Sequence, residues 1–211
     1  MSTIIKKKQF PNYRKYTMDL AGRPLTLETG KIAELANAAV MVTYGDTVVL
    51  VTATAAPRPR DGIDFFPLSV DFEEKMYAVG RIPGSFMRRE GRPGEKGILT
   101  SRVIDRPIRP LFPGDFRNDV AIMATVMSVD PDCSPEIAAL IGTSAALAIS
   151  DIPWNGPVGA LKIGYVDGKL VVNPTYEQSQ VSDLDVTVVS TGKKVVMIEA
   201  GANEIPNDVM F

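Results

Sequence analysis

The strongest constraint on the fold is a pair of apolar segments separated by a two-residue turn. Residues 39–44 (AVMVTY) and 47–53 (TVVLVTA) flank Gly45-Asp46. A Gly-Asp pair between two β-type segments is typical of a tight β-hairpin. Residues 47–53 are apolar on both faces, which predicts a central strand rather than an edge strand. A sheet is therefore expected to extend on both sides of this segment.

Six further segments have the pattern of β-strands. In the first of them, apolar and polar residues alternate, as expected for a strand with one buried face. A second hairpin signal, Asp167-Gly168, lies between two short apolar segments. In chain order the additional predicted strands are 66–72, 118–129, 161–166, 169–172, 184–189 and 195–199.

Two helices are predicted, and the more apolar one is residues 136–149. Ser134 and Pro135 precede it and suit the N-cap and the first position of a helix. Alanine, leucine and isoleucine cover nearly the whole circumference of this segment. A helix that is apolar on all sides is buried, so we expect it to pack on a sheet.

The second predicted helix is residues 95–106 (EKGILTSRVIDR). Leu99 and Val103 are spaced four residues apart and are expected to mark its buried side, and Pro107 is expected to end it. Strands that outnumber two helices predict an α+β domain with a mixed sheet packed on helices. The length of 211 residues suits one large domain, or one domain plus a fragment of another.

Composition excludes several classes of protein. With no histidine in the sequence, a Ser-His-Asp triad or a histidine metal ligand is excluded. The single cysteine, Cys133, can form no intrachain disulfide or zinc cluster and is interpreted as a small buried hydrophobic residue. No apolar segment is long enough for a secretion signal or a membrane span, so we predict a cytoplasmic protein with no membrane contact.

Charge is distributed unevenly along the chain. The net charge is −2, yet residues 81–117 carry nine cations against four carboxylates, a net +5 that leaves the rest at −7. Eight of the nine cations are arginine. The planar guanidinium group binds phosphate oxygens in a bidentate manner, whereas lysine would serve equally well for solubility. This segment therefore predicts contact with phosphates.

Within this segment, residues 84–97 (GSFMRREGRPGEKG) combine glycines, one aromatic residue and three arginines. Such a loop would let Phe86 stack on a base while Arg88, Arg89 and Arg92 follow the phosphates of a single strand.

Three more arginines follow on the second predicted helix and just past it. Arg102 and Arg106 are four residues apart on one helical face, and Arg109 follows Pro107. Their guanidinium groups could converge on one anion. The alternative is ordinary surface ion pairing of Asp105 with a neighbouring arginine, which contributes about 0.5 kcal/mol.

Two other patterns carry less weight. Asp71, Glu73 and Glu74 lie at the end of a predicted strand, where consecutive carboxylates are usually solvated, so no metal site is predicted. The glycines of residues 80–91 do not form a phosphate-binding P-loop, because no Gly-Lys-Ser or Gly-Lys-Thr follows them.

Four segments of the sequence resemble the first ribonuclease PH-like core domain of the bacterial polynucleotide phosphorylase (polyribonucleotide nucleotidyltransferase) family. The resemblance extends from about residue 8 to the end of the chain, and the motifs occur in family order. They are FFPL at 65–68, YAVGRIPGSFMRREGRP at 77–93, SRVIDRPIRPLFP at 101–113 and NGPVGA at 155–160.

The resemblance implies a ribonuclease PH-like core with the ribosomal protein S5 domain 2-like fold. The implied activity is 3′-to-5′ phosphorolysis of RNA, in which inorganic phosphate releases nucleoside diphosphates, or the reverse polymerisation. The implied partners are single-stranded RNA, a homotrimer and, where the bacterium assembles one, an RNA-degradation complex. Magnesium or manganese is implied on a second core domain, so this chain is expected to hold no catalytic or metal-binding residue.

The resemblance also assigns the arginines to two places. Phe86, Met87, Arg88 and Arg89 fall on the family's pore loop, where Met87 replaces a second aromatic residue, and Arg92 matches the next basic position. Arg102, Arg106 and Arg109 match arginines that approach RNA near the catalytic cleft. Residues 1–211 are expected to be the first core domain, truncated before its closing helix and lacking the second core, KH and S1 domains.

A truncated chain of this kind is expected to be inactive alone. Two other classes of function stay open from the residues themselves. One is a non-catalytic RNA-binding module, which would bind RNA irrespective of phosphate. The other is an interaction fragment that assembles with copies of itself and has no affinity for RNA.

Overall fold

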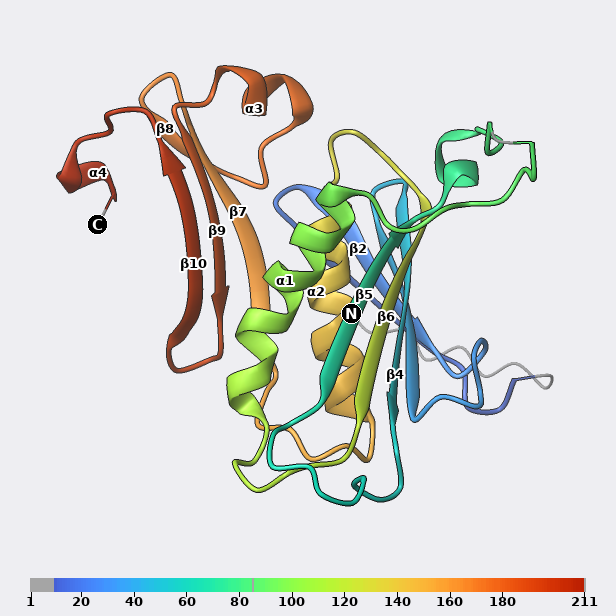
Figure 1. Cartoon of the computed structure of the whole chain (residues 1–211). Helices are drawn as coiled ribbons and strands as arrows, with labels where there is room; N and C mark the ends of the chain where they lie inside the picture. The colour runs from blue at the N-terminus through green and yellow to red at the C-terminus, as the bar shows by residue number, and fades with distance from the viewer. Residues whose placement is uncertain (1–9, 85, 211) are drawn as a thin grey trace.

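The computed structural model describes residues 10–84 and 86–210, which form two β-sheets with helices between them (Figure 1). The larger sheet has six strands in the order β1-β2-β3-β4-β6-β5. Neighbouring strands within this sheet are antiparallel, except for β5 and β6, which run parallel. The strands are β1 (Arg14–Leu20), β2 (Arg23–Thr29), β3 (Ala38–Tyr44), β4 (Thr47–Ala55), β5 (Leu68–Glu74) and β6 (Val120–Ser128).

The hairpin predicted around Gly45-Asp46 is confirmed as β3 and β4, which pair from Tyr44 opposite Thr47 to Ala38 opposite Ala53. Gly45 adopts φ +56° and lies so close to Cys133 that a Cβ atom would come within 2.5 Å of Sγ. Only glycine fits this close approach with a left-handed backbone. β4 lies between β3 and β6, which confirms it as a central strand.

Helix α2 (Pro135–Ile149) packs across β3 and β4 and forms the centre of the core. Its residues Ile137, Leu140 and Leu147 are buried, as the sequence predicts. A Cβ atom at Gly142 would come within 2.7 Å of Val42 and Val51 side chains, so the glycine lets the helix approach the sheet closely.

Helix α1 (Glu95–Ile108) lies beside α2 and against β5, and it differs from the prediction in two respects. It continues through Pro107, because the backbone stays helical and the N–H of Arg109 still donates to the carbonyl of Asp105. Of the two residues expected to mark its buried side, Val103 is partly buried against the core, but Leu99 is 57% exposed. The buried residues are Gly97, Thr100, Ile104, Pro107 and Ile108.

The smaller sheet has four antiparallel strands in the order β10-β9-β7-β8, and Figure 1 shows it on the side of the helices away from the larger sheet. Both predicted strand pairs of this region are confirmed. The strands are β7 (Gly159–Val166), β8 (Lys169–Val172), β9 (Leu184–Ser190) and β10 (Val195–Ala202). Ala160, Val189 and Met197 belong to the same hydrophobic cluster as the large sheet, so one core joins both sheets.

A buried polar network also joins the two sheets. The side-chain amide of Asn173, after β8, donates to the hydroxyl of Tyr44 on β3 at 3.0 Å. The guanidinium of Arg23 on β2 donates to the carbonyl of Asn173 at 2.8 Å. Because Asn173 is 5% exposed, its polar groups need these partners, and the network fixes how the sheets meet.

Two strands and several short helices escaped the sequence analysis. β1 and β2 were missed because β1 is mostly exposed and lacks a buried alternating face. The two-helix prediction omits four short elements, which are η1 (Met76–Val79), η2 (Arg109–Leu111), α3 (Tyr176–Val181) and α4 (Asn207–Met210). The α+β class with a mixed sheet is confirmed.

Two further observations concern the core and the helices. Cys133 is fully buried, as predicted, and burial raises the pKa of its thiol to about 11. In the part of the chain that the structure describes, none of the helices has the length and apolar character to cross a bilayer.

The contact between α2 and the sheet gives a stability prediction. Gly142→Ala should lower the free energy of unfolding by about 1–3 kcal/mol, because the added methyl group overpacks Val42 and Val51. The decrease should appear although alanine favours helix by about 1 kcal/mol. Urea denaturation measures it, with Gly114→Ala as the control, since a Cβ atom there meets nothing within 4 Å. Equal stability of the two variants would contradict the close packing.

Candidate nucleic-acid interface

The segment that joins β5 to α1 projects from the end of the larger sheet, and we call its described residues, 75–84 and 86–94, the arginine loop (Figure 1). It begins with the short helix η1, which ends at Gly80 in the left-handed conformation with φ +68°. The N–H of Arg81 returns to the carbonyl of Met76 at 3.0 Å. The loop therefore starts with a compact turn before it extends into solvent.

Phe86 and Met87 lie at the outer part of the arginine loop. Phe86 is 100% exposed and Met87 is 62% exposed, so this chain gives the aromatic ring no packing partner within the described residues. Arg88 has φ +47°, which is uncommon for a residue with a side chain. An isolated, fully exposed phenylalanine beside arginines has the composition of a platform on which a base could stack.

Arg88, Arg89 and Arg92 are also exposed, as a phosphate-binding role requires. Within residues 10–84 and 86–210 their side chains make no hydrogen bond or ion pair, so these guanidinium groups have no protein acceptor in that part of the chain. A cavity of about 570 Å³ lies below the loop, between the end of β5 and the start of α1. Arg89 and Arg92 line this cavity together with Glu73, Glu74 and Glu90.

The two ends of the loop meet at a polar contact that we call the neck clasp, made by Lys75, Glu90 and the backbone N–H of Met76. Lys75 Nζ lies 2.5 Å from Glu73 and 3.3 Å from Glu90. The N–H of Met76 donates to Glu90 Oε1 at 2.8 Å. The hydrogen bond to Glu73 is the main cause that raises the pKa of Lys75, so this amine is charged at neutral pH.

The carboxylates at the end of β5 are engaged in ion pairs rather than gathered at one point. Glu73 pairs with Lys75, and Glu74 lies 3.5 Å from Lys96. Although both carboxylates line the cavity, each is paired with a different lysine. Throughout the described residues, no group of three or more acidic or cysteine side chains is placed to hold a metal ion. The resemblance places magnesium or manganese on a second core domain rather than on these carboxylates, and the described carboxylates form no such group.

Arg102 and Arg106 project from the exposed side of α1. Arg106 lies 3.7 Å from Glu199 of β10, and both side chains are more than half exposed. An exposed pair of this kind contributes little to stability and exchanges readily with other anions. Both residues remain available to a phosphate, although the buried side of the helix differs from the predicted one.

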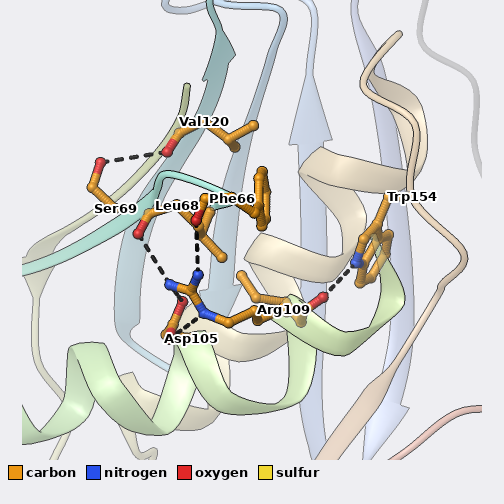
Figure 2. A network of polar contacts seen from close by, with 8 residues as sticks. Phe66, Leu68, Ser69, Asp105, Arg109, Val120 and Trp154 are labelled. Carbon is orange, nitrogen blue, oxygen red and sulfur yellow. Dashed lines mark hydrogen bonds and ion pairs between the residues drawn. The ribbon is translucent and has the colours of Figure 1, made fainter. Parts of the chain in front are cut away.

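Arg109 has a different environment, shown in Figure 2. Its guanidinium binds both carboxylate oxygens of Asp105, at 2.8 and 3.0 Å. It also donates to the backbone carbonyls of Phe66 at 3.2 Å and Leu68 at 3.1 Å. Four hydrogen bonds occupy a group with five donors, so the structure does not bring Arg109 together with Arg102 and Arg106 on one anion. Arg109 instead forms the ion pair with Asp105 that the sequence analysis gave as the alternative.

These contacts attach α1 to the free edge of β5. The N–H of Phe72 donates to Ser101 Oγ on α1 at 3.0 Å. At the end of α1, Trp154 Nε1 donates to the carbonyl of Ile108 at 3.0 Å, which satisfies one of the helix's terminal acceptors (Figure 2). The strand and the helix that carry the arginine loop are thus held together along their length.

Sequence reasoning missed Lys75 and Glu90. The available signal was Glu90 itself, a carboxylate placed among arginines in a segment predicted to bind phosphates. The negative charge of such a residue weakens phosphate binding, which suggests that its carboxylate has a partner within the fold.

Comparison with known proteins places these features in a family. A family model described as "3' exoribonuclease family, domain 1" matches residues 21–153, and one described as "3' exoribonuclease family, domain 2" matches residues 156–211. The first alone covers more than half of the chain.

Relatives with high sequence identity carry the name polyribonucleotide nucleotidyltransferase. The chain is 62% identical over 199 residues to the one from Ruminiclostridium cellulolyticum and 58% identical over 199 residues to the one from Clostridioides difficile. Each match covers 94% of this chain but 28% of the relative. Among solved structures, rice Rrp46 is similar with a TM-score of 0.70 at 16% identity, covering 89% of this chain and 84% of the other, which shows the shared fold.

The contrast between the hydrogen-bonded Arg109 and the exposed Arg102 gives a prediction on stability. Arg109→Ala should lower the free energy of unfolding by about 2 kcal/mol, because two backbone carbonyls and Asp105 are left without a charged donor. Arg109→Lys should not restore it, since an ammonium group cannot reproduce the planar fork. Arg102→Ala should change stability by less than about 0.5 kcal/mol. Urea denaturation compares the three variants, and equal effects of the two alanine variants would contradict the distinction.

Proposed function

The chain belongs to the 3′ exoribonuclease family, and on that premise we propose that it forms the RNA-binding part of a phosphorolytic exoribonuclease. The substrate is single-stranded RNA, degraded from its 3′ end to nucleoside diphosphates with inorganic phosphate as co-substrate. The high identity to polyribonucleotide nucleotidyltransferases supports this assignment. The chain spans 28% of the length of those relatives, so the phosphorolytic activity of the whole enzyme is part of our proposal.

The observation that carries the proposal is the arrangement of the arginine loop. It presents a fully exposed Phe86 next to three exposed arginines that have no protein acceptor among the described residues. An aromatic face takes a base irrespective of its identity, and guanidinium groups take the adjoining phosphates. A nuclease that removes one nucleotide after another needs this kind of sequence-tolerant grip.

Phosphorolysis makes a specific electrostatic demand. Phosphate attacks the terminal phosphorus atom, a new P–O bond forms, and the bond to the 3′ oxygen of the preceding nucleotide breaks. An anion must approach a polyanion, at a cost of about 4 kcal/mol per pair of close unit charges near a protein surface. Arg102 and Arg106 on α1 are proposed to offset this repulsion. The proposed role of Arg109 is to hold α1 on β5 rather than to contact RNA.

Domain organisation, oligomeric state and localisation are part of the same proposal. We propose that residues 1–211 act as one core unit, which the hydrophobic cluster shared by both sheets supports. A homotrimer in the cytoplasm is proposed from the family resemblance. The exposed Tyr77, Val79 and Ile82 near the base of the arginine loop are compatible with contact to another copy.

One test separates the enzymatic role from simple RNA binding. The chain replaces the matching 199 residues of the Ruminiclostridium cellulolyticum relative, and the release of nucleoside diphosphates from poly(A) is measured with and without phosphate. The chimera should show phosphate-dependent release, and the 211-residue chain alone should show none, because the resemblance places the catalytic and metal-binding residues on a second core domain. Combined Arg102→Ala and Arg106→Ala should lower the rate more than about tenfold, the decrease expected when one charge-assisted hydrogen bond is removed.

A folded chimera that binds RNA without releasing nucleoside diphosphates would favour a non-catalytic RNA-binding module. This alternative has support in the absence of histidine, the commonest general base. Assembly without RNA affinity would favour a self-assembling fragment instead. Turnover by the chain alone would contradict the expectation that the catalytic groups lie elsewhere.

The side chains of the arginine loop can be tested separately. Phe86→Ala should weaken binding of single-stranded RNA by about 1–3 kcal/mol with little change in salt dependence, because stacking carries no charge. Arg88→Ala or Arg89→Ala should instead reduce the salt slope by about 0.7 for each phosphate that the variant no longer neutralises. Met87→Phe should tighten binding by adding a second aromatic face. The measurement is RNA affinity against salt concentration, and wild-type binding by Phe86→Ala together with no effect of Met87→Phe would show the loop to be structural.

A further inference from the structure

Glu90 is the unexplained residue of the arginine loop. It lies between Arg89 and Arg92, where a negative charge weakens the attraction of the loop for an anionic polymer. Electrostatics alone would therefore predict that removing Glu90 improves RNA binding. The structure shows a second use for the carboxylate, because it accepts the N–H of Met76 and pairs with Lys75.

We propose that Glu90 is a positioning residue that closes the neck of the arginine loop and thereby holds its arginines and Phe86 in place for RNA. This inference rests on the proposed function and adds a residue to it. Glu90 joins two points 14 residues apart in the chain. Lys75 is anchored in turn by Glu73 at the end of β5, so the neck clasp connects the loop to the sheet.

The neck clasp matters because the other described residues of the arginine loop have no comparable side-chain contact. The side chains of Arg88, Arg89 and Arg92 make no hydrogen bond or ion pair within the described ranges 10–84 and 86–210. Arg89 directly precedes Glu90, so its backbone direction follows from where Glu90 is held. Ordering a loop on binding reduces affinity, and a loop whose ends are already fixed loses less freedom.

The direction in which RNA affinity changes in Glu90→Ala distinguishes the proposal from a simple counter-charge. If Glu90 only neutralised its neighbours, Glu90→Ala would tighten RNA binding. If it positions the loop, Glu90→Ala should weaken binding by about three- to tenfold, although the loop becomes more positive. Glu90→Gln keeps an oxygen that can accept the Met76 N–H and should restore part of the affinity.

Glu95 provides the matched control. It is an exposed carboxylate on the first turn of α1, close in sequence but outside the neck clasp. Glu95→Ala removes the same charge from the same segment, so it should leave RNA affinity unchanged or raise it. The difference between the two alanine variants isolates the positioning effect from the charge effect.

The experiment measures two quantities on the 211-residue chain. The first is the affinity for a single-stranded oligoribonucleotide at several salt concentrations. The second is the rate of tryptic cleavage after Arg81, identified by mass spectrometry, because this bond lies inside the loop and away from the substituted positions. Glu90→Ala should raise the cleavage rate severalfold, Glu90→Gln less, and Glu95→Ala not at all. Thermal melting confirms that all variants remain folded.

The outcomes are separable. Tighter RNA binding by Glu90→Ala, or cleavage after Arg81 at the wild-type rate, overturns the positioning role while leaving the proposed function intact. Absence of RNA binding by the wild-type chain and by the chimera overturns the proposed function and, with it, the role in RNA positioning. Weaker binding with faster cleavage in Glu90→Ala, both partly restored in Glu90→Gln, supports the proposal.

Discussion

The attachment of helix α1 to the free edge of β5 is the interaction on which the candidate site depends. Among the described residues β5 pairs with a strand, β6, on one side only, so its other side would expose unpaired backbone groups. Side chains of α1 and of Arg109, which directly follows it, satisfy three nearby groups, since Arg109 binds the carbonyls of Phe66 and Leu68 and Ser101 accepts the N–H of Phe72. Gly97 lets the helix come close, because a Cβ atom there would lie 3.1 Å from the carbonyl of Phe72. The direction of the helix is thereby fixed along the strand.

This attachment explains why one residue type has two roles in a short segment. The chain leaves the end of β5, forms the arginine loop and returns as α1, so the ends of the loop are brought together by the strand and helix themselves. The guanidinium of Arg109 is occupied by the hydrogen bonds of this attachment, whereas Arg88, Arg89 and Arg92 on the loop are exposed. The density of arginine correctly marks the segment as unusual, but it does not distinguish the residue that holds the scaffold.

The sequence predicts the hairpins and both main helices because their signals are local. A turn pair such as Gly45-Asp46 and a continuous apolar surface such as that of α2 are visible within fifteen residues or fewer. The environment of Arg109 is not local, since its carbonyl partners lie 41 and 43 residues away. The buried side of α1 was misjudged because it uses Gly97 and Thr100, which do not count as apolar. A stripe of small residues beside Ile104 and Ile108 is the signal that would have identified it.

Helix α1 also couples the arginine loop to the smaller sheet. The two family models meet between residues 153 and 156, and Trp154 in that interval donates to the carbonyl of Ile108 at the end of α1. Just before that end of the helix, Arg106 lies 3.7 Å from Glu199 of β10. The same helix is thus held by β5 and by the connection between the two sheets, and it also carries an exposed ion pair to the smaller sheet. A helix shared in this way connects the loop and the exposed arginines of α1 to one scaffold, so RNA that contacts both would meet cations whose spacing depends on how α1 is attached to β5.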